Sequence, residues 1–80
     1  MRKSLFSRNY ETFVAMLREL REAAGVTQIE LAKQLKESQS FISKCESGQR
    51  RLDILEVRQW CQALETSFVS FLRTVDGRLR

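Results

Sequence analysis

The polar side chains with the clearest chemical potential lie together in residues 39–44. In a helix, positions 39, 40 and 43 share one face, position 44 flanks it, and this segment carries no carboxylate. A glutamine amide can pair with N6 and N7 of adenine, and a serine hydroxyl can pair with several bases. The pattern suits the reading of base edges in a DNA major groove, and it also suits an ordinary first helical turn. The candidate base-reading residues are Gln39, Ser40, Ser43 and Lys44.

The sequence offers little for catalysis or for metal binding. Histidine, the commonest general base and metal ligand, is absent from the 80 residues. Cys45 and Cys61 lack the spacing of a zinc site, and they are most simply interpreted as reduced and buried. No phosphate-binding loop or activated nucleophile is visible. We therefore predict a protein that is not an enzyme, holds no metal or other cofactor, and has no evident small-molecule ligand.

The charge is positive and unevenly distributed. The chain has 14 basic and 10 acidic residues, a net charge of +4. Residues 1–52 carry the whole excess, and residues 53–80 are neutral overall. A basic N-terminal part favours a surface that faces a polyanion, although many solvated surfaces reach the same charge.

No segment is apolar enough to cross a membrane. The longest uninterrupted apolar run is Phe13 to Leu17, which is five residues, whereas a span needs about 20. No apolar signal segment follows Met1. We expect no membrane partner and a cytoplasmic location, associated with the nucleoid.

Five short amphipathic helices are expected to position the polar segment. Apolar residues recur at helical spacing over residues 10–24, and no segment alternates as a strand does, so the fold class is all-α. Capping boxes open two later helices, at residues 27–30 and 53–56. The further expected caps and terminators are Ser7 or Asn9, Ser38, Ser67, Gly25 and Gly48.

The whole chain, residues 1–80, is expected to form one domain, because the usual allowance of about 100–200 residues per domain leaves no room for a second. Residues 1–6 are expected to be a flexible basic arm and residues 76–80 a flexible tail.

Trp60 lies at core spacing in the fourth helix. The expected inward residues of that helix are Ile54, Val57, Trp60, Cys61 and Leu64.

The last helix, expected from Phe68 to about Val75, carries more apolar residues than one face can bury. The surplus favours a dimer interface, unless the extra side chains simply lie singly on the surface. The candidate interface residues are Phe68, Val69, Leu72 and Val75.

Residues 27–46 read as two capped helices joined by a three-residue break, and so short a connection requires a steep crossing. The pieces TQ-x-ELA (residues 27–32) and SQS-x-IS-x-x-E-x-G (residues 38–48) follow a segment LRELREAAGVTQ over residues 17–28. In these pieces the chain resembles the phage repressor and Cro type of helix-turn-helix domain, the xenobiotic-response-element-like (XRE-like) regulators. The resemblance covers about residues 13–72.

The resemblance implies a compact five-helix domain that binds double-stranded DNA sequence-specifically and regulates transcription. It further implies a repressor that acts as a homodimer on a two-fold operator, with the third helix as reader. Residue by residue, it assigns base contacts to Gln39, Ser40 and Lys44, and an ion pair to Arg21 and Glu46. The phosphate contacts that it implies are Gln28, Gln49, Arg50 and Arg51.

The chain departs from the family pattern where Lys36 and Glu65 stand in place of glycine. If the turn is kept, Lys36 should have a positive φ angle. Phe41 falls at a variable position, where it could touch a thymine methyl group or pack against the break at Lys36.

The alternative function is an antitoxin-like protein-interaction module that also binds DNA for autoregulation.

Overall fold

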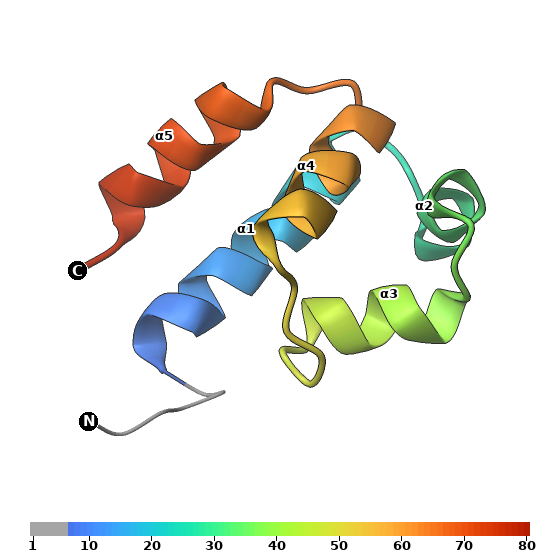
Figure 1. Ribbon diagram of the computed structural model, residues 1–80, viewed down its shortest axis with the longest axis horizontal. Coiled ribbons are helices and arrows are strands. Elements are labelled where there is room, and N and C mark those ends of the chain that lie inside the picture. The colour runs from blue at the N-terminus through green and yellow to red at the C-terminus, as the bar shows by residue number, and fades with distance from the viewer. Residues whose placement is uncertain (1–6) are drawn as a thin grey trace.

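The computed structural model describes residues 7–80, and within this range it contains helices and no strand. α2 and α3 lie together at one end of the molecule, while α5 lies at the other side of α1 and α4 (Figure 1). The all-α prediction is confirmed. The helices are α1 (Arg8–Ala23), α2 (Gln28–Leu35), α3 (Gln39–Glu46), α4 (Ile54–Ala63) and α5 (Phe68–Arg78).

Every helix begins at a side chain that accepts a hydrogen bond from its first turn. The Thr27 hydroxyl accepts from the Glu30 N–H at 3.1 Å, and the Glu30 carboxylate accepts from the Thr27 N–H at 2.9 Å. The second predicted capping box, at Asp53 and Glu56, is also present. These bonds satisfy backbone donors that a helix start otherwise leaves unpaired. Of the two candidate caps for α1, the structure uses Ser7.

Two of the helix ends have a left-handed residue that is not glycine. Lys36 has φ 59° and Glu65 has φ 56°, so the positive φ predicted for Lys36 is confirmed. At the end of α2 this conformation turns the chain so that the Glu37 N–H donates to the Ala32 carbonyl at 2.9 Å. The short α2–α3 connection therefore forms although Lys36 is strained in this left-handed conformation.

The core includes Trp60, which is fully buried as expected and belongs to one cluster with buried residues of all the other helices. Cys45 and Cys61 are buried free thiols, and burial raises the pKa of the Cys45 thiol to about 11. A thiol with that pKa stays protonated at neutral pH, so it acts as a small apolar group in the core. Ile54 was expected to face inward, but it is 58% exposed. Helical spacing predicts which face of α4 is buried, but it does not predict how far along the helix the packing extends.

The last helix extends beyond its expected end at about Val75, into residues 76–80 that were expected to form a flexible tail. α5 continues to Arg78, and the side chain of Asn9 accepts from the Arg80 N–H at 3.1 Å. The chain end is thereby tied to the start of α1. Residues 1–6, the expected arm, lie outside the described residues.

The longer α5 also changes the candidate dimer surface. Val75 is only 7% exposed and packs into the core with Phe71, so its assignment to an interface is wrong. Val69, by contrast, is 61% exposed, while Phe68 and Leu72 are partly buried. Only part of the apolar surplus of α5 therefore faces outward.

Replacing Lys36 with glycine should stabilise the domain by about 0.5–1 kcal/mol. Glycine removes the left-handed penalty of about 1–2 kcal/mol but increases the entropy of the unfolded chain. Urea unfolding measures the change, and Lys36→Ala is the matched control because alanine keeps the strain. A glycine variant no more stable than the alanine variant would contradict the proposed strain.

Candidate nucleic-acid interface

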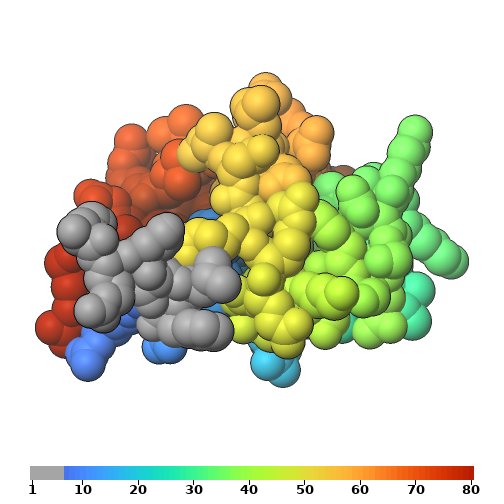
Figure 2. Space-filling view, turned by 60° about the horizontal axis from the view of Figure 1, so that its bottom comes forward, coloured from blue at the N-terminus to red at the C-terminus, as the bar shows by residue number. Residues whose placement is uncertain are grey.

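α2 and α3 form the helix-turn-helix unit expected from residues 27–46. In Figure 1, α2 is seen nearly end-on while α3 runs across the view, so the two helices cross steeply. α3 packs inward through Ile42 and Cys45, both fully buried. Its other side forms part of one face of the molecule, beside the loop that follows it (Figure 2).

The structure brings the four candidate base-reading side chains to the exposed side of α3. Gln39, Ser40, Ser43 and Lys44 are all exposed, and the first turn of α3 contains no acidic residue. The Ser38 hydroxyl caps the helix by accepting from the Phe41 N–H at 3.0 Å. The face is therefore polar, weakly basic and sterically open, which suits a groove lined with hydrogen-bonding base edges.

A buried ion pair joins α1 to the end of α3. The Arg21 Nε and Nη2 groups donate to the two carboxylate oxygens of Glu46, at 2.7 and 3.0 Å, and Arg21 Nη1 donates to the Val26 carbonyl at 2.8 Å. The two side chains are only 9% and 4% exposed. These bonds to Glu46 raise the pKa of Arg21, so the guanidinium stays charged. The pair suggested by the family resemblance thus holds the reader candidate against α1.

Gln28 extends this network to the first residue of α3. Its Nε2 donates to Glu46 Oε1 at 3.0 Å, and its Oε1 accepts from Gln39 Nε2 at 2.9 Å. One amide hydrogen of Gln28 remains outside these two bonds. Contact with a phosphate, the role implied by the resemblance, stays a prediction for this residue.

Arg50 is already engaged by its own chain. Its guanidinium donates to both carboxylate oxygens of Glu56, at 2.8 and 2.9 Å, and to the Arg51 carbonyl. The hydrogen bonds from Arg50 lower the pKa of Glu56 and raise that of Arg50. A phosphate contact by Arg50, which remains a prediction, would compete with Glu56 for the same donors.

Phe41 lies beneath that pair. The Arg50 guanidinium carbon is 4.9 Å from the centre of the Phe41 ring, which is partly buried against the core. Phe41 therefore supports the loop after α3 through a cation–π contact. The sequence did not predict this cluster of Phe41, Arg50 and Glu56, because its members come from α3, a loop and α4.

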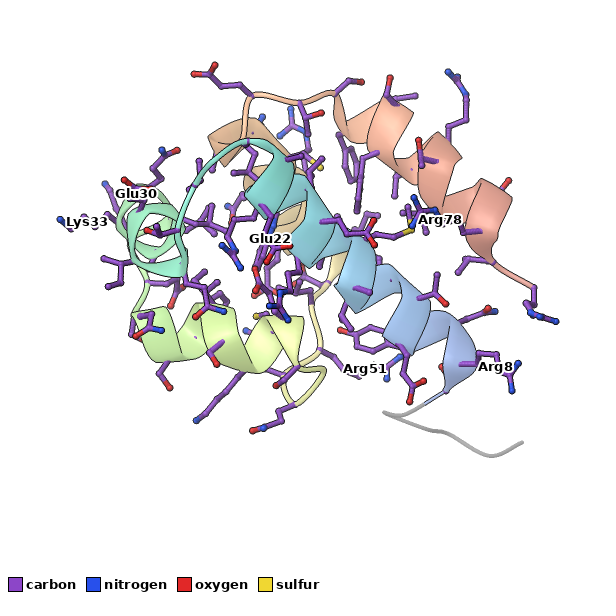
Figure 3. The ribbon with its side chains drawn as sticks, turned by 180° about the vertical axis from the view of Figure 1, so that it is seen from behind. Arg8, Glu22, Glu30, Lys33, Arg51 and Arg78 are labelled. Carbon is purple, nitrogen blue, oxygen red and sulfur yellow. The ribbon has the colours of Figure 1, made fainter. Side chains whose placement is uncertain are left out.

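Arg51 joins the same loop to α1. Its guanidinium carbon lies 4.1 Å from the centre of the Tyr10 ring, and the Tyr10 hydroxyl accepts from the Leu52 N–H at 3.2 Å. Figure 3 shows Arg51 beside the first turn of α1, which also carries Arg8. Sequence reasoning placed Tyr10 in the apolar stripe of α1 and missed its hydroxyl as a support for the loop. Gln49, the remaining phosphate candidate, is exposed in this loop.

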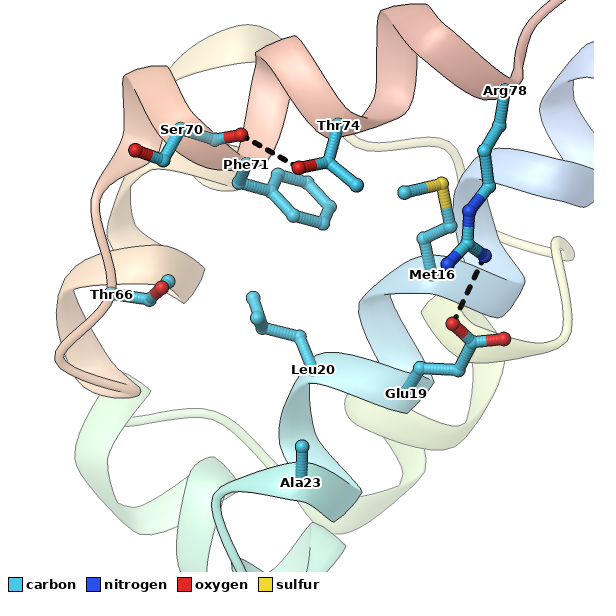
Figure 4. A pocket seen from close by; sticks show the side chains of 9 residues that line it. All are labelled: Met16, Glu19, Leu20, Ala23, Thr66, Ser70, Phe71, Thr74 and Arg78. Carbon is cyan, nitrogen blue, oxygen red and sulfur yellow. Dashed lines mark hydrogen bonds and ion pairs between the residues drawn. The ribbon is translucent and has the colours of Figure 1, made fainter.

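An apolar groove of about 280 Å³ lies between α1 and α5. Met16, Leu20 and Phe71 line it, and the exposed pair between Arg78 and Glu19, at 3.1 Å, lies at its edge (Figure 4). No cysteine or histidine lines this groove. Among residues 7–80, no group of three or more metal-ligating side chains is present.

None of the helices in residues 7–80 combines the length and the apolar character that crossing a bilayer requires.

The comparisons with known proteins agree with this geometry. The helix-turn-helix family profile matches residues 17–71. An XRE-family like protein from Pseudomonas syringae pv. tomato str. DC3000 is 39% identical, covers 86% of this chain and 84% of its own, and superposes with a TM-score of 0.81. The chain belongs to the XRE type of helix-turn-helix family, a class of DNA-binding transcriptional regulators.

Two further solved structures are named as regulators. The clp gene regulator ClgR from C. glutamicum is 28% identical over 92% of this chain and 96% of its own, with a TM-score of 0.79. The restriction-modification controller protein C.AhdI from Aeromonas hydrophila is 30% identical over 75% of this chain and 91% of its own, with a TM-score of 0.68. A comparison with curated protein sequences gives no match.

Removing Arg21 should destabilise the domain strongly, because Glu46 would stay buried without a counter-charge. We expect Arg21→Met to lower the free energy of unfolding by about 3–5 kcal/mol. The double variant with Glu46→Leu should lose less, since it removes both charges. Urea unfolding of the three proteins measures this. A double variant no more stable than Arg21→Met would contradict the argument.

Proposed function

We propose that the protein is a repressor that binds a two-fold symmetric operator as a homodimer, with α3 entering the major groove of double-stranded DNA. The observation that carries the proposal is the exposed face of α3, on which Gln39, Ser40, Ser43 and Lys44 stand together without an acidic neighbour in the first turn. These side chains would read base edges, whereas phosphate contacts would set register and orientation.

The loop after α3 would contact the phosphates of the DNA backbone. Gln49, Arg50 and Arg51 are exposed there, directly beside the proposed reader. Before any DNA binds, Glu56 holds the side chain of Arg50, and the Tyr10 ring holds that of Arg51. Such preorganisation reduces the entropy lost on binding, although Arg50 would have to share its donors with Glu56.

A dimer is proposed because one small module reads few bases. Two-fold dimers of helix-turn-helix domains place their readers about 34 Å apart, in successive major grooves. Outward-facing apolar side chains support self-association, since α5 exposes Val69 and the start of α4 exposes Ile54 and Leu55. The similar structures named as a gene regulator and as a controller protein support a regulatory role.

Gln39→Ala should weaken binding to the preferred duplex and relax the preference at one base pair. A good bidentate contact contributes about 1–3 kcal/mol of discrimination. Selection from a random duplex pool, followed by titration of the selected site, measures both effects. Gln34→Ala is the matched control, because Gln34 is exposed on α2 beside α4 rather than on α3. Unchanged affinity and preference in Gln39→Ala would refute α3 as the reader.

Val69→Asp should shift the protein from dimer to monomer and weaken binding to a duplex with two half-sites. A carboxylate at the centre of an apolar interface would be buried unpaired. Sedimentation at tens of micromolar protein measures the association. Ser70→Asp is the control, since it adds the same charge to the same turn on another face of α5. A wild-type protein that is monomeric both free and on DNA would remove the dimer from the proposal.

A further inference from the structure

The indole nitrogen of Trp60 is a buried donor that the described part of the chain leaves unsatisfied. Trp60 is fully buried, and within residues 7–80 its Nε1 atom has no hydrogen-bond partner. The indole N–H donates and cannot accept. Buried donors are nearly always paired, with the protein or with an ordered water, because an unpaired one loses its hydrogen bonds to solvent on folding. The Trp60 N–H therefore requires an acceptor.

A small cavity adjoins Trp60 between α2, α3 and α4. It has a volume of about 30 Å³, and Trp60 is one of the residues that line it. Glu37, Glu56 and Gln59 also line the cavity, and each has side-chain oxygen that accepts hydrogen bonds. A cavity needs at least about 10–15 Å³ to hold one water molecule, so this one is large enough. The donor and its potential acceptors thus surround a space of molecular size.

The lining of this cavity favours a neutral ligand that both accepts and donates. A cation would lie against the Trp60 N–H, which has no lone pair to offer it. An anion would be repelled by the carboxylates of Glu37 and Glu56. Organic ligands are too large, since their pockets usually have about 300–1,000 Å³. A water molecule meets every requirement, because it accepts from the indole N–H and donates its own hydrogens to oxygen atoms.

Glu56 is the acceptor best placed to receive a hydrogen from such a water. Its carboxylate already accepts two hydrogen bonds from Arg50 and one from the Asp53 N–H, at 2.8, 2.9 and 2.9 Å. A carboxylate has about four acceptor positions, so one remains. The Glu56 side chain is only 27% exposed, whereas Glu37 is an exposed residue. The Glu56 carboxylate is therefore fixed in position and can still accept.

We propose that this cavity binds one water molecule, which accepts from the Trp60 Nε1–H and donates to the carboxylate of Glu56. The water completes a hydrogen-bond chain that runs from the core through Glu56 to Arg50, in the loop after α3. The carboxylate that engages Arg50 is thereby connected to the core. The proposal is independent of DNA binding, because every group in the chain belongs to the unbound protein.

Nuclear magnetic resonance of the 80-residue protein tests the site. Trp60 is the only tryptophan, so its indole proton gives a single, assignable signal. This proton should show a negative nuclear Overhauser effect with water, the sign of a water that tumbles with the protein. The rotating-frame experiment separates this contact from proton exchange with bulk water. Among the described residues that line the cavity, none carries a hydroxyl group that could relay the effect.

Matched variants identify the acceptor. Glu56→Met removes the carboxylate but keeps a side chain of similar length, so the contact between the Trp60 indole proton and water should be lost. Glu37→Met makes the same change at the other carboxylate of the cavity, and the contact should remain. Glu56→Gln should retain the contact, because it keeps an oxygen and suits the third position of a capping box. Dispersed backbone amide signals establish that each variant is folded.

Each outcome decides part of the proposal. A resolved indole proton without any water contact in the wild-type protein would overturn it, whether or not the variants fold. A contact that persists in folded Glu56→Met, or that is lost in folded Glu37→Met, would overturn the assignment of Glu56. Loss in Glu56→Met alone would support the proposal. None of these results bears on whether α3 reads DNA, which Gln39→Ala tests separately.

Discussion

The buried ion pair between Arg21 and Glu46 is the constraint on which the proposed site depends. α3 has eight residues, and a helix of that length is not stable alone. Its position is therefore set by what it packs against. Ile42 and Cys45 supply the apolar contact, but apolar contacts are not directional. The two charge-assisted bonds of Arg21 add the direction, because a misplaced α3 would leave two charges buried without partners.

The exposed surface beside α3 is organised in the same way, by contacts made within the chain. The Arg50 guanidinium lies over Phe41 and donates to both carboxylate oxygens of Glu56, and the Arg51 guanidinium lies over Tyr10. The loop after α3 is thereby connected to α1, α3 and α4. Side chains suited to phosphate thus also support the loop that presents them. Long cationic side chains can do both, since their stems and planar groups pack while their charge stays near solvent.

Local features of this fold were predictable from the sequence, and for a common reason. Caps such as Thr27, Ser38 and Asp53 bond to backbone groups three residues away, so their geometry follows from neighbouring residues alone. The left-handed Lys36 followed from the family pattern. The sequence did not predict how far packing and helices extend: Ile54 is exposed, Val75 is buried, and α5 continues through residues expected to be a tail. Periodicity identifies a face, whereas neighbouring helices decide how much of it is covered.

By itself, the sequence determined the all-α class, the number of helices, their caps, and the polar composition of α3, because these depend on interactions within a few residues. Only the tertiary structure decided which polar side chains touch one another. The contacts of Gln28 with Gln39 and Glu46 span 11 and 18 residues, and that of Tyr10 with Leu52 spans 42. Such contacts form only after the core has packed, since no local preference brings these groups together.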